Sequence, residues 1–285
     1  MRLGVIGHTG YAELPPILDS LSRLASSLGL NLEFEDELHE AAGLGKRLTD
    51  PRSIDALITL GGDGTLLRGA RLLAGAPVPI LGVNLGRLGF LTTCGSDDIE
   101  EAIRLLASGK YVAEARMCLR ASAMDGDGVD RQDWLALNDV VVHKGGFARV
   151  VRLKVTVDGE SIGTYAADGI IVSTPTGSTA YSLSAGGPVV VPTVESMILT
   201  PISAHTLGVR PLVLPPDAVV GIDTSDSSEE MMVTIDGQVG TKLVPGEKLV
   251  VRKADNPVRI VRLPGTSFFE RMRGKLGWGD VPGRD

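Results

Sequence analysis

Hydrophobic and polar positions in roughly the first hundred residues follow two alternating periods. Short apolar runs predict strands, and stretches with an apolar residue every three or four positions predict helices. The predicted strands are Leu3–Gly7, Leu32–Glu35, Ala56–Leu60 and Val78–Val83, and the predicted helices are Leu14–Leu28, Thr65–Leu73 and Ile99–Ala107. Strands and helices that alternate in this order predict an α/β domain with a parallel, Rossmann-like sheet covered by helices.

The pattern changes at about residue 110, where short strands are separated by Gly, Pro and Asp turns. The predicted strands are Val112–Ala123, Ala136–His143, Val150–Val157, Gly163–Tyr165, Ile170–Ser173, Pro211–Leu214, Val219–Ile222, Met231–Ile235 and Lys248–Arg252. Helical spacing is found at Ala180–Ser184, with Glu195–Leu199 as a second candidate. This pattern of short strands and turns predicts a mainly β second domain in which one antiparallel sheet packs on another.

These patterns divide the chain into three parts. We predict an α/β domain over residues 1–108, a mainly β domain over 109–265 and a C-terminal tail over 266–285. The tail is expected to form a short helix or a frayed end, and we also consider that it packs back on the first domain. The chain has 285 residues, of which 43% are hydrophobic and 22% charged, so it holds enough apolar material for two moderate cores.

Charge and cysteine content narrow the class of protein. The formal net charge is −7 and no basic tract is present, which argues against a nucleic-acid partner. Cys94 and Cys118 are too few for a zinc site or a disulfide framework, and they fit a reducing cytosol. The apolar start is too short for a signal peptide, and no run approaches the length of a membrane span. We therefore expect a soluble, cytoplasmic protein with no membrane partner.

The most informative motif is Gly61-Gly-Asp-Gly-Thr65, which connects the predicted strand Ala56–Leu60 to the helix that follows. Its glycines let the backbone approach a ligand closely, and the start of a helix offers N–H groups to an anion. Asp63 places a carboxylate on this turn, so the motif suggests phosphoryl transfer in which the acid acts on a hydroxyl nucleophile or on a metal. The plainer alternative is a steric strand-to-helix turn in which Asp63 caps the helix.

A second dense motif is the segment Asp168–Pro188. Seven residues between 173 and 184 carry aliphatic hydroxyl groups, which suit ribose and amide groups because they both donate and accept hydrogen bonds. Gly177 allows close backbone approach, and Tyr181 can stack on a base. The segment could instead be a Ser- and Thr-rich strand and turn with ordinary caps, but its density favours ligand binding.

A third motif is the pair Asn138-Asp139, which stands before a β-branched run. An amide can pair with an adenine edge, and a carboxylate can hold ribose hydroxyls. Alone this pair is a weak indication, since Asn-Asp is also common in turns.

Taken together, these motifs resemble those of bacterial NAD kinases, which use ATP or polyphosphate. The resemblance covers roughly residues 55–240 and rests on Gly61–Thr65, Leu85–Leu91, Leu137–Val140, Asp168–Pro188, Ala204–Leu207, Arg210–Pro211 and Ile235–Gln238. The first of these motifs is shared with diacylglycerol and sphingosine kinases, whereas the segment from Thr174 to Pro188 is highly specific.

The resemblance implies transfer of the γ-phosphoryl group of ATP, or a phosphoryl group of polyphosphate, to the 2′-hydroxyl of the adenosine ribose of NAD. It implies that Asp63 is the base that takes the hydroxyl proton, that Gly64 makes a backbone contact beside it and that Arg68 faces phosphate. Asn138 and Asp139 are similar to the adenine and ribose contacts.

The resemblance also extends to the rest of the dinucleotide. Asp168 matches a contact to the nicotinamide end. The remaining implied NAD-binding positions are Arg149, Ala166, Thr179, Ala180, Tyr181, Ser182, Leu183, Ser184 and Gln238. Two positions depart from the family: Ala166 stands where several relatives have a basic residue, and Asp139 stands where Glu is frequent.

Further expectations follow from the same resemblance. The reaction needs a divalent cation, Mg²⁺ above all, held mainly by substrate phosphates and water, and no protein metal site is predicted. Arg68, Arg71, Arg87 and Arg149 could supply a local positive field around the anionic substrates. The family also implies a homodimer or a homotetramer.

Two alternatives stay open at this point. A lipid or sphingoid kinase of the same superfamily would explain Gly61–Thr65, but it would need an apolar pocket and gives no reason for the hydroxyl-rich segment. A non-catalytic sensor that binds NAD or NADP would explain that segment, but it gives no reason for Asp63.

Overall fold

The structure is a computed structural model that describes residues 1–43, 45–86, 89–125, 130–145, 151–204, 208–225, 231–243, 246–265 and 267–279. Contacts between residues divide the chain into two compact units. The first unit comprises Met1–Ala115 together with Val258–Asp285, and the second comprises Arg116–Pro257.

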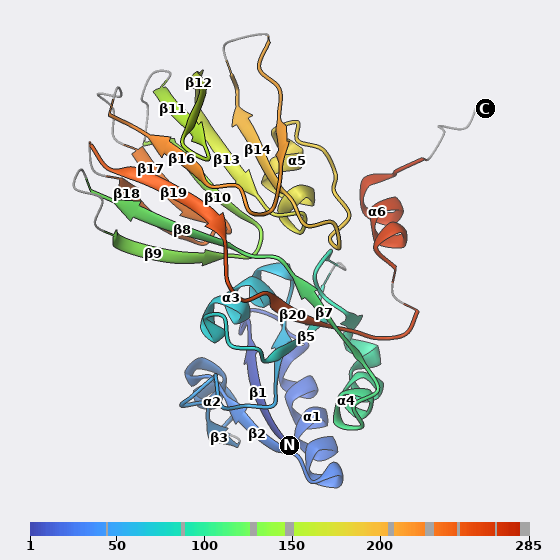
Figure 1. Cartoon of the computed structure of the whole chain (residues 1–285). Helices are drawn as coiled ribbons and strands as arrows, with labels where there is room; N and C mark the ends of the chain where they lie inside the picture. Colours follow the sequence, from blue (N-terminus) through green and yellow to red (C-terminus); the bar gives the residue numbers. More distant parts are fainter. Residues whose placement is uncertain are drawn as a thin grey trace. The chain divides into compact units, whose positions relative to one another are not determined.

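The first unit is built on an eight-stranded sheet with the order β3-β2-β1-β4-β5-β20-β7, to which β6 adds by pairing with β5 (Figure 1). The pairings among β1 to β6, and that of β20 with β5, are parallel. The strands are β1 (Arg2–Gly7), β2 (Asn31–Phe34), β3 (Lys46–Arg47), β4 (Ala56–Leu60), β5 (Pro79–Asn84), β6 (Cys94–Gly95), β7 (Val112–Arg116) and β20 (Val258–Arg262). The helices are α1 (Leu14–Leu28), α2 (Asp36–Ala42), α3 (Asp63–Leu73), α4 (Ile99–Ala107) and α6 (Phe268–Leu276), with a 3₁₀ turn at Ser96–Asp98.

The sequence patterns of this unit are explained by burial. Helices α1 and α4 have the predicted bounds, because each buries an apolar stripe in the same core as the strands. Helix α1 ends where Gly29 adopts a left-handed conformation with φ of 66°, a common way to stop a helix. Helix α3 begins at Asp63, two residues before the predicted start, and this places Asp63 in its first turn.

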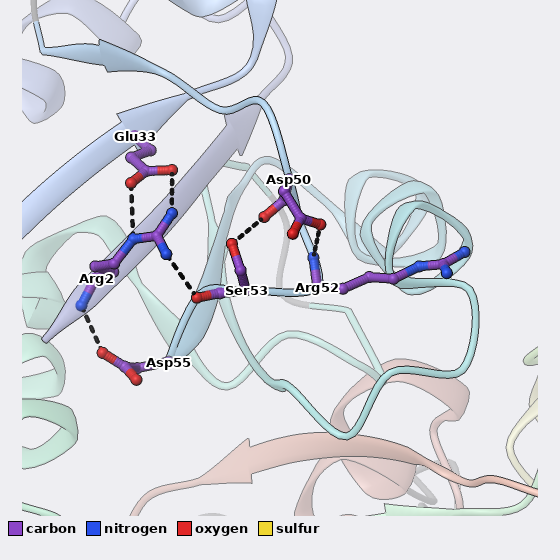
Figure 2. Close-up of polar contacts among 6 residues, drawn as sticks. All are labelled: Arg2, Glu33, Asp50, Arg52, Ser53 and Asp55. Atoms are coloured by element: carbon purple, nitrogen blue, oxygen red, sulfur yellow. Dashed lines mark hydrogen bonds and ion pairs between the residues drawn. The ribbon is translucent and has the colours of Figure 1, made fainter.

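A polar network ties β1 to β2 and to the turn before β4, as Figure 2 shows. The backbone N–H of Arg2 donates to Asp55 (2.6 Å), and its guanidinium donates to the Glu33 carboxylate (2.9 and 3.2 Å) and to the carbonyl of Ser53 (3.0 Å). Within the turn, the hydroxyl of Ser53 donates to the carbonyl of Asp50 (3.0 Å). These bonds fix the start of strand β4, the strand that leads to Asp63.

The second unit consists, within the described residues, of two six-stranded antiparallel sheets (Figure 1). Their orders are β15-β14-β13-β10-β17-β18 and β12-β11-β16-β19-β8-β9. The strands are β8 (Leu119–Met124), β9 (Asp130–Ala136), β10 (Asp139–Lys144), β11 (Val151–Val157), β12 (Glu160–Ala167), β13 (Gly169–Ser173), β14 (Met197–Ile202), β15 (Leu212–Leu214), β16 (Val220–Asp223), β17 (Met231–Ile235), β18 (Val239–Leu243) and β19 (Lys248–Lys253). A 3₁₀ turn (Gly177–Thr179) and the short helix α5 (Tyr181–Ser184) follow β13.

Buried aliphatic residues from both of these sheets form one core, including Val140 and Ile170 from one sheet and Leu153 and Leu249 from the other. The fold class predicted from the sequence, a parallel α/β part followed by a sheet-on-sheet β part, is therefore confirmed. No helix among the described residues combines the length and the apolar character needed to cross a membrane.

Several predicted elements need correction. The predicted strand 112–123 is two strands, β7 and β8, which belong to different sheets. The candidate helix Glu195–Leu199 is wrong: its apolar residues belong to strand β14, which pairs with β13 and β15 on either side. Pairing on both edges outweighs a short helical period.

The division into units also differs from the predicted bounds. Strand β20, at residues 258–262, lies within the range predicted for the second domain, but it pairs with β5 in the sheet of the first unit. The first unit also extends to Ala115 and takes in α6, which forms within the predicted tail. Because a strand must pair laterally, the return of the chain to the first sheet cannot be read from local composition.

Candidate active site

Asp63 lies in the first turn of α3, directly after β4 and the glycine turn, and its side chain is half-buried. Its carboxylate accepts three backbone hydrogen bonds from one loop. The amide of Phe90 donates to Oδ2 (2.8 Å), and the amides of Leu91 and Thr92 donate to Oδ1 (3.0 and 3.2 Å). The position of the acid is therefore fixed by main-chain groups on a second segment of the first unit.

These bonds leave part of the carboxylate available. A carboxylate offers about four acceptor positions, two on each oxygen. Within the part of the chain that the structure describes, Oδ1 of Asp63 accepts two hydrogen bonds and Oδ2 accepts one. Oδ2 thus keeps a lone pair with which Asp63 can receive a proton.

The loop that holds Asp63 depends on a glycine. A Cβ atom at Gly89 would overlap all three carboxylate atoms of Asp63, so only a residue without a side chain allows this approach. Gly89 lies in the motif Leu85–Leu91, but no role was predicted for it from the sequence. No local sequence signal indicates this role, because the residue that Gly89 approaches is distant in sequence.

Arg68, one turn further along α3, is held by Glu35. Its guanidinium donates to both carboxylate oxygens of Glu35 and to the carbonyl of Gly7 (2.8 Å). The hydrogen bond to Glu35 raises the pKa of Arg68 above its usual value, although burial opposes this. The Glu35 carboxylate also accepts the N–H of Gly7 (2.6 Å).

Gly64, the predicted backbone contact, is exposed beside Asp63.

The second unit contains a cavity of about 580 Å³, a volume typical of small-molecule sites. It brings together residues from three separate motifs of the sequence. Its walls are formed by Asn138, Asp139, Val141, His143, Lys144, Asp168, Ala180, Tyr181, Ile202, Thr234, Asp236 and Gly237. Five predicted NAD-binding residues, namely Asn138, Asp139, Asp168, Ala180 and Tyr181, therefore share one cavity.

Asp236 anchors one wall of this cavity. Its carboxylate accepts the backbone N–H groups of Leu137 (3.1 Å), Asn138 (2.7 Å) and Asp139 (3.2 Å), and its own N–H donates to the carbonyl of Asp139 (2.9 Å). The turn that contains Asp236 is part of a sequence motif, in which a role was predicted only for Gln238. Because the Asp236 carboxylate binds backbone N–H groups of Asn138 and Asp139, no local sequence signal indicates its role.

Asp139 is an acid in an unusual environment. The residue is only 3% exposed, and it lies beside the carboxylate of Asp236. Burial, with a smaller contribution from Asp236, raises the pKa of Asp139 to about 7. The cavity therefore holds a carboxyl group that changes charge near neutral pH.

A charged pair and a histidine complete the walls. Nζ of Lys144 donates to Oδ1 of Asp168 (2.7 Å), so the predicted nicotinamide-end contact already has a cationic neighbour. Nδ1 of His143 lies 2.9 Å from the carbonyl of Lys144, and Nε2 lies 2.9 Å from the hydroxyl of Thr234. Neither Lys144 nor His143 was predicted from the sequence to be part of the site.

Four other predicted residues lie in or just before α5, outside the walls given above. Ser182 is fully buried, and its hydroxyl shares a hydrogen bond with that of Thr200 (3.0 Å). Thr179 and Leu183 are half-buried, and Ser184 is exposed. The Ser182 hydroxyl therefore contributes to the packing beneath α5.

The remaining predicted positions are dispersed. Ala166 lies on β12 opposite Arg152 of β11. Gln238 is exposed in the turn after β17, where its N–H donates to the carbonyl of Ile235 (2.9 Å). Arg149 and Arg87 lie outside the described residues. No group of three or more His, Cys, Asp or Glu residues in the described segments is arranged to hold a metal ion.

Comparison with known proteins places this geometry in a family. The model of the ATP-NAD kinase N-terminal domain matches residues 45–111, and that of the ATP-NAD kinase C-terminal domain matches residues 137–263. An NAD kinase of Gemmatimonas aurantiaca is 60% identical over 285 residues, covering 100% of this chain and 99% of the relative. An NAD kinase of Moorella thermoacetica is 44% identical, covering 96% of this chain and 89% of the relative.

Solved structures give the same result. Yeast NADH kinase in complex with NADH has a TM-score of 0.87 at 25% identity, over 100% of this chain and 90% of the other. An NAD kinase from Archaeoglobus fulgidus in complex with ATP has a TM-score of 0.77 at 27% identity, over 97% of this chain and 99% of the other.

Proposed function

The chain belongs to the NAD kinase family, and we propose that it transfers the γ-phosphoryl group of ATP, or a phosphoryl group of polyphosphate, to the 2′-hydroxyl of the adenosine ribose of NAD. The product is NADP. The observation that carries the proposal is the cavity of the second unit, where Asn138, Asp139, Asp168 and Tyr181 line one space. Amide, carboxylate and aromatic groups together suit an adenine, a ribose and a second polar group.

In this proposal Asp63 supplies the base. Oδ2, the carboxylate oxygen that keeps a lone pair, takes the proton of the 2′-hydroxyl as the hydroxyl oxygen attacks the γ-phosphorus. A bond forms between the ribose oxygen and phosphorus, and the bond from phosphorus to the departing diphosphate oxygen breaks. A positioned base of this kind contributes about 10²- to 10⁴-fold to the rate.

The cavity residues would bind the dinucleotide. We assign the adenine edge to the Asn138 amide, the ribose hydroxyls to the Asp139 carboxylate and the nicotinamide end to Asp168. Lys144 supports the last assignment, because its ammonium neutralises Asp168 and can itself donate to a ligand.

The phosphate donor would enter as its magnesium complex. Among the residues that the structure describes, no group of three or more His, Cys, Asp or Glu is arranged to hold a metal ion. We propose that Mg²⁺ is held by the donor phosphates and water and is part of the substrate. We further propose a homodimer or homotetramer, as the family resemblance implies. A cytoplasmic location is supported by the two cysteines, which are both free and buried.

The two alternative functions have less support. A lipid or sphingoid kinase needs an apolar pocket for an acyl chain, whereas the cavity carries Asp139, Asp168, Asp236 and Lys144 on its walls. A non-catalytic sensor needs no base, whereas three amides and a glycine hold Asp63 in place.

The test is a direct assay of the purified chain. NAD, ATP and Mg²⁺ are supplied, and NADP is detected with an NADP-specific dehydrogenase, in parallel with polyphosphate as donor and with diacylglycerol as acceptor. We expect NADP from NAD and no phosphorylated lipid. Phosphorylated lipid without NADP would favour the lipid kinase, and tight NAD binding with no transfer from either donor would favour the sensor.

A further inference from the structure

Arg271, on α6, is a buried cation with an unusual set of partners. It lies in the first half of the helix and is only 7% exposed. One terminal nitrogen of its guanidinium donates to the carbonyls of Phe90 (2.9 Å) and Thr92, and the other donates to that of Thr93 (3.3 Å). The side chain thus binds three main-chain oxygens of a single short segment.

That segment is the one that holds Asp63. Phe90 and Thr92 each donate their N–H group to the Asp63 carboxylate and accept a hydrogen bond from Arg271 at their carbonyl oxygen. Arg271 and Asp63 are therefore linked through the backbone of the same two residues. All of these groups belong to the first unit.

Aromatic packing holds α6 against the same loop. The ring of Phe90 lies 6.3 Å from that of Phe268, the first residue of the helix. The ammonium of Lys275, near the end of the helix, lies 5.3 Å from the centre of the Phe90 ring. Residues at the two ends of α6, Phe268 and Lys275, thus contact Phe90. Arg271, which lies between them on the helix, binds the backbone of the loop.

A purely structural helix would not need a cation at this position. Burial, with a smaller contribution from Arg262, lowers the pKa of Arg271 to about 10. Burying a guanidinium costs free energy unless its donors are satisfied, and an apolar residue would fill such a site more cheaply. The forked donors of arginine can hold several carbonyls in a fixed arrangement, which an aliphatic side chain cannot do.

We infer that Arg271 is a positioning residue for Asp63: it fixes the 90–93 loop so that the loop amides hold the carboxylate in its reactive orientation. The inference rests on the proposed role of Asp63 as the base. It makes the C-terminal helix, more than 200 residues from Asp63 in sequence, part of the apparatus for phosphoryl transfer to a ribose hydroxyl.

The test compares Arg271→Met, which keeps an unbranched apolar side chain but removes the guanidinium, with Arg271→Lys and with the control Arg273→Met. Arg273 is exposed on the same helix and has no assigned role. We expect Arg271→Met to lower kcat by about tenfold or more, since misplacing a catalytic group by about 1 Å can cost up to about 10²-fold. The KM for NAD should change by less than about twofold, Arg271→Lys should recover part of kcat, and Arg273→Met should match wild type.

A double-mutant cycle with Asp63→Asn separates positioning from general stability. If Arg271 acts through Asp63, Arg271→Met should change the residual rate of Asp63→Asn by less than about twofold. Circular dichroism confirms that each variant is folded, and Arg271→Lys replaces Arg271→Met in the cycle if the latter does not fold.

The outcomes distinguish the two claims. If Asp63→Asn lowers kcat but Arg271→Met and Arg271→Lys do not, or if the two effects are additive, the positioning role is overturned and the proposed function stands. If Asp63→Asn retains the full rate, the base is wrong and the positioning inference fails with it. Non-additive losses confined to kcat support both.

Discussion

The two units hold their candidate functional groups in different ways. In the first unit a single side chain, Asp63, is held by three backbone amides and by the close approach of Gly89. In the second unit the cavity is lined by side chains from several strands and turns, including the carboxyl groups of Asp139, Asp168 and Asp236 and the ammonium group of Lys144.

This difference suits the two tasks in the proposed reaction. A base must be held at one angle to the hydroxyl, and backbone amides provide a rigid support without rotamer freedom. A dinucleotide has to be distinguished from other metabolites, and this requires donors and acceptors placed at several points. Changes to the support of Asp63 should therefore affect kcat, and changes to the cavity should affect NAD affinity.

Among changes to the residues that support the two sites, the largest effect is expected from Gly89→Ala. The added methyl group would overlap the Asp63 carboxylate and push it from its amides, so we expect kcat to fall by about 10²-fold. Gly95→Ala is the matched control, because its Cβ would have its nearest neighbour at 3.9 Å. Steady-state kinetics measure both, and a normal kcat in Gly89→Ala would contradict the account of how Asp63 is held.

In the second unit, Gly177→Ala should act on binding. Its Cβ would overlap the backbone of Asn138 and displace a cavity wall, so we expect NAD to bind about fivefold more weakly or worse, with a smaller change in kcat. Gly240→Ala, with the nearest atom 3.8 Å away, should bind NAD like wild type. Calorimetric titration measures the Kd, and an unchanged value for Gly177→Ala would show that this wall does not contact the ligand.

A smaller effect concerns pH and Asp139. Its pKa is raised to about 7 in the folded protein, so between about pH 4 and pH 7 the folded state keeps a proton that the unfolded chain has lost. The contribution of this group to the free energy of unfolding therefore falls as pH rises towards 7 and is constant above it. Asp139→Asn should remove this pH-dependent decrease in the free energy of unfolding.

Urea unfolding of wild type and Asp139→Asn at pH 5.5 and pH 6.5 gives the comparison. We expect wild type to lose about 1 kcal/mol more than the variant over that interval. Equal losses would mean that the Asp139 carboxyl does not titrate in this range.

The smallest effect is expected at the polar network of Figure 2. Arg2→Met removes the bonds to Glu33 and Ser53, which lie at the entry of the first sheet. Because the Arg2 side chain is 43% exposed, we expect neither kcat nor the Kd for NAD to change measurably. A clear change in either quantity would show that the sites depend on more than their immediate supports.

The sequence predicted the regular parts of the fold well, because burial imposes a period. Helices α1 and α4 follow their apolar stripes, and the parallel order of the first sheet follows from the alternation of elements. The split between β7 and β8 was missed because Met117 and Cys118 are not turn residues, and strand β14 was missed because its lateral partners are distant in sequence.

The residues that line the cavity were predictable from sequence motifs, whereas the residues that hold them in place were not. Asn138, Asp139, Asp168 and Tyr181 were predicted from two motifs and share one cavity. Their roles, like that of Asp63, stay predictions. Asp236, Arg271 and the amides of the 90–92 loop act through backbone atoms, which have the same chemistry in every residue and so leave no pattern in the sequence.

The central claim is that Asp63 of the first unit is the base and that the cavity of the second unit binds NAD. It is tested most directly by Asp63→Asn, with the Kd for NAD and the rate of NADP formation measured on the same preparation. The variant keeps the size of the side chain and loses the base. We expect the Kd to stay within about twofold of wild type while the rate falls by about 10²-fold or more. A rate near that of wild type, or a loss explained entirely by weaker NAD binding, would contradict the assignment of the base to Asp63.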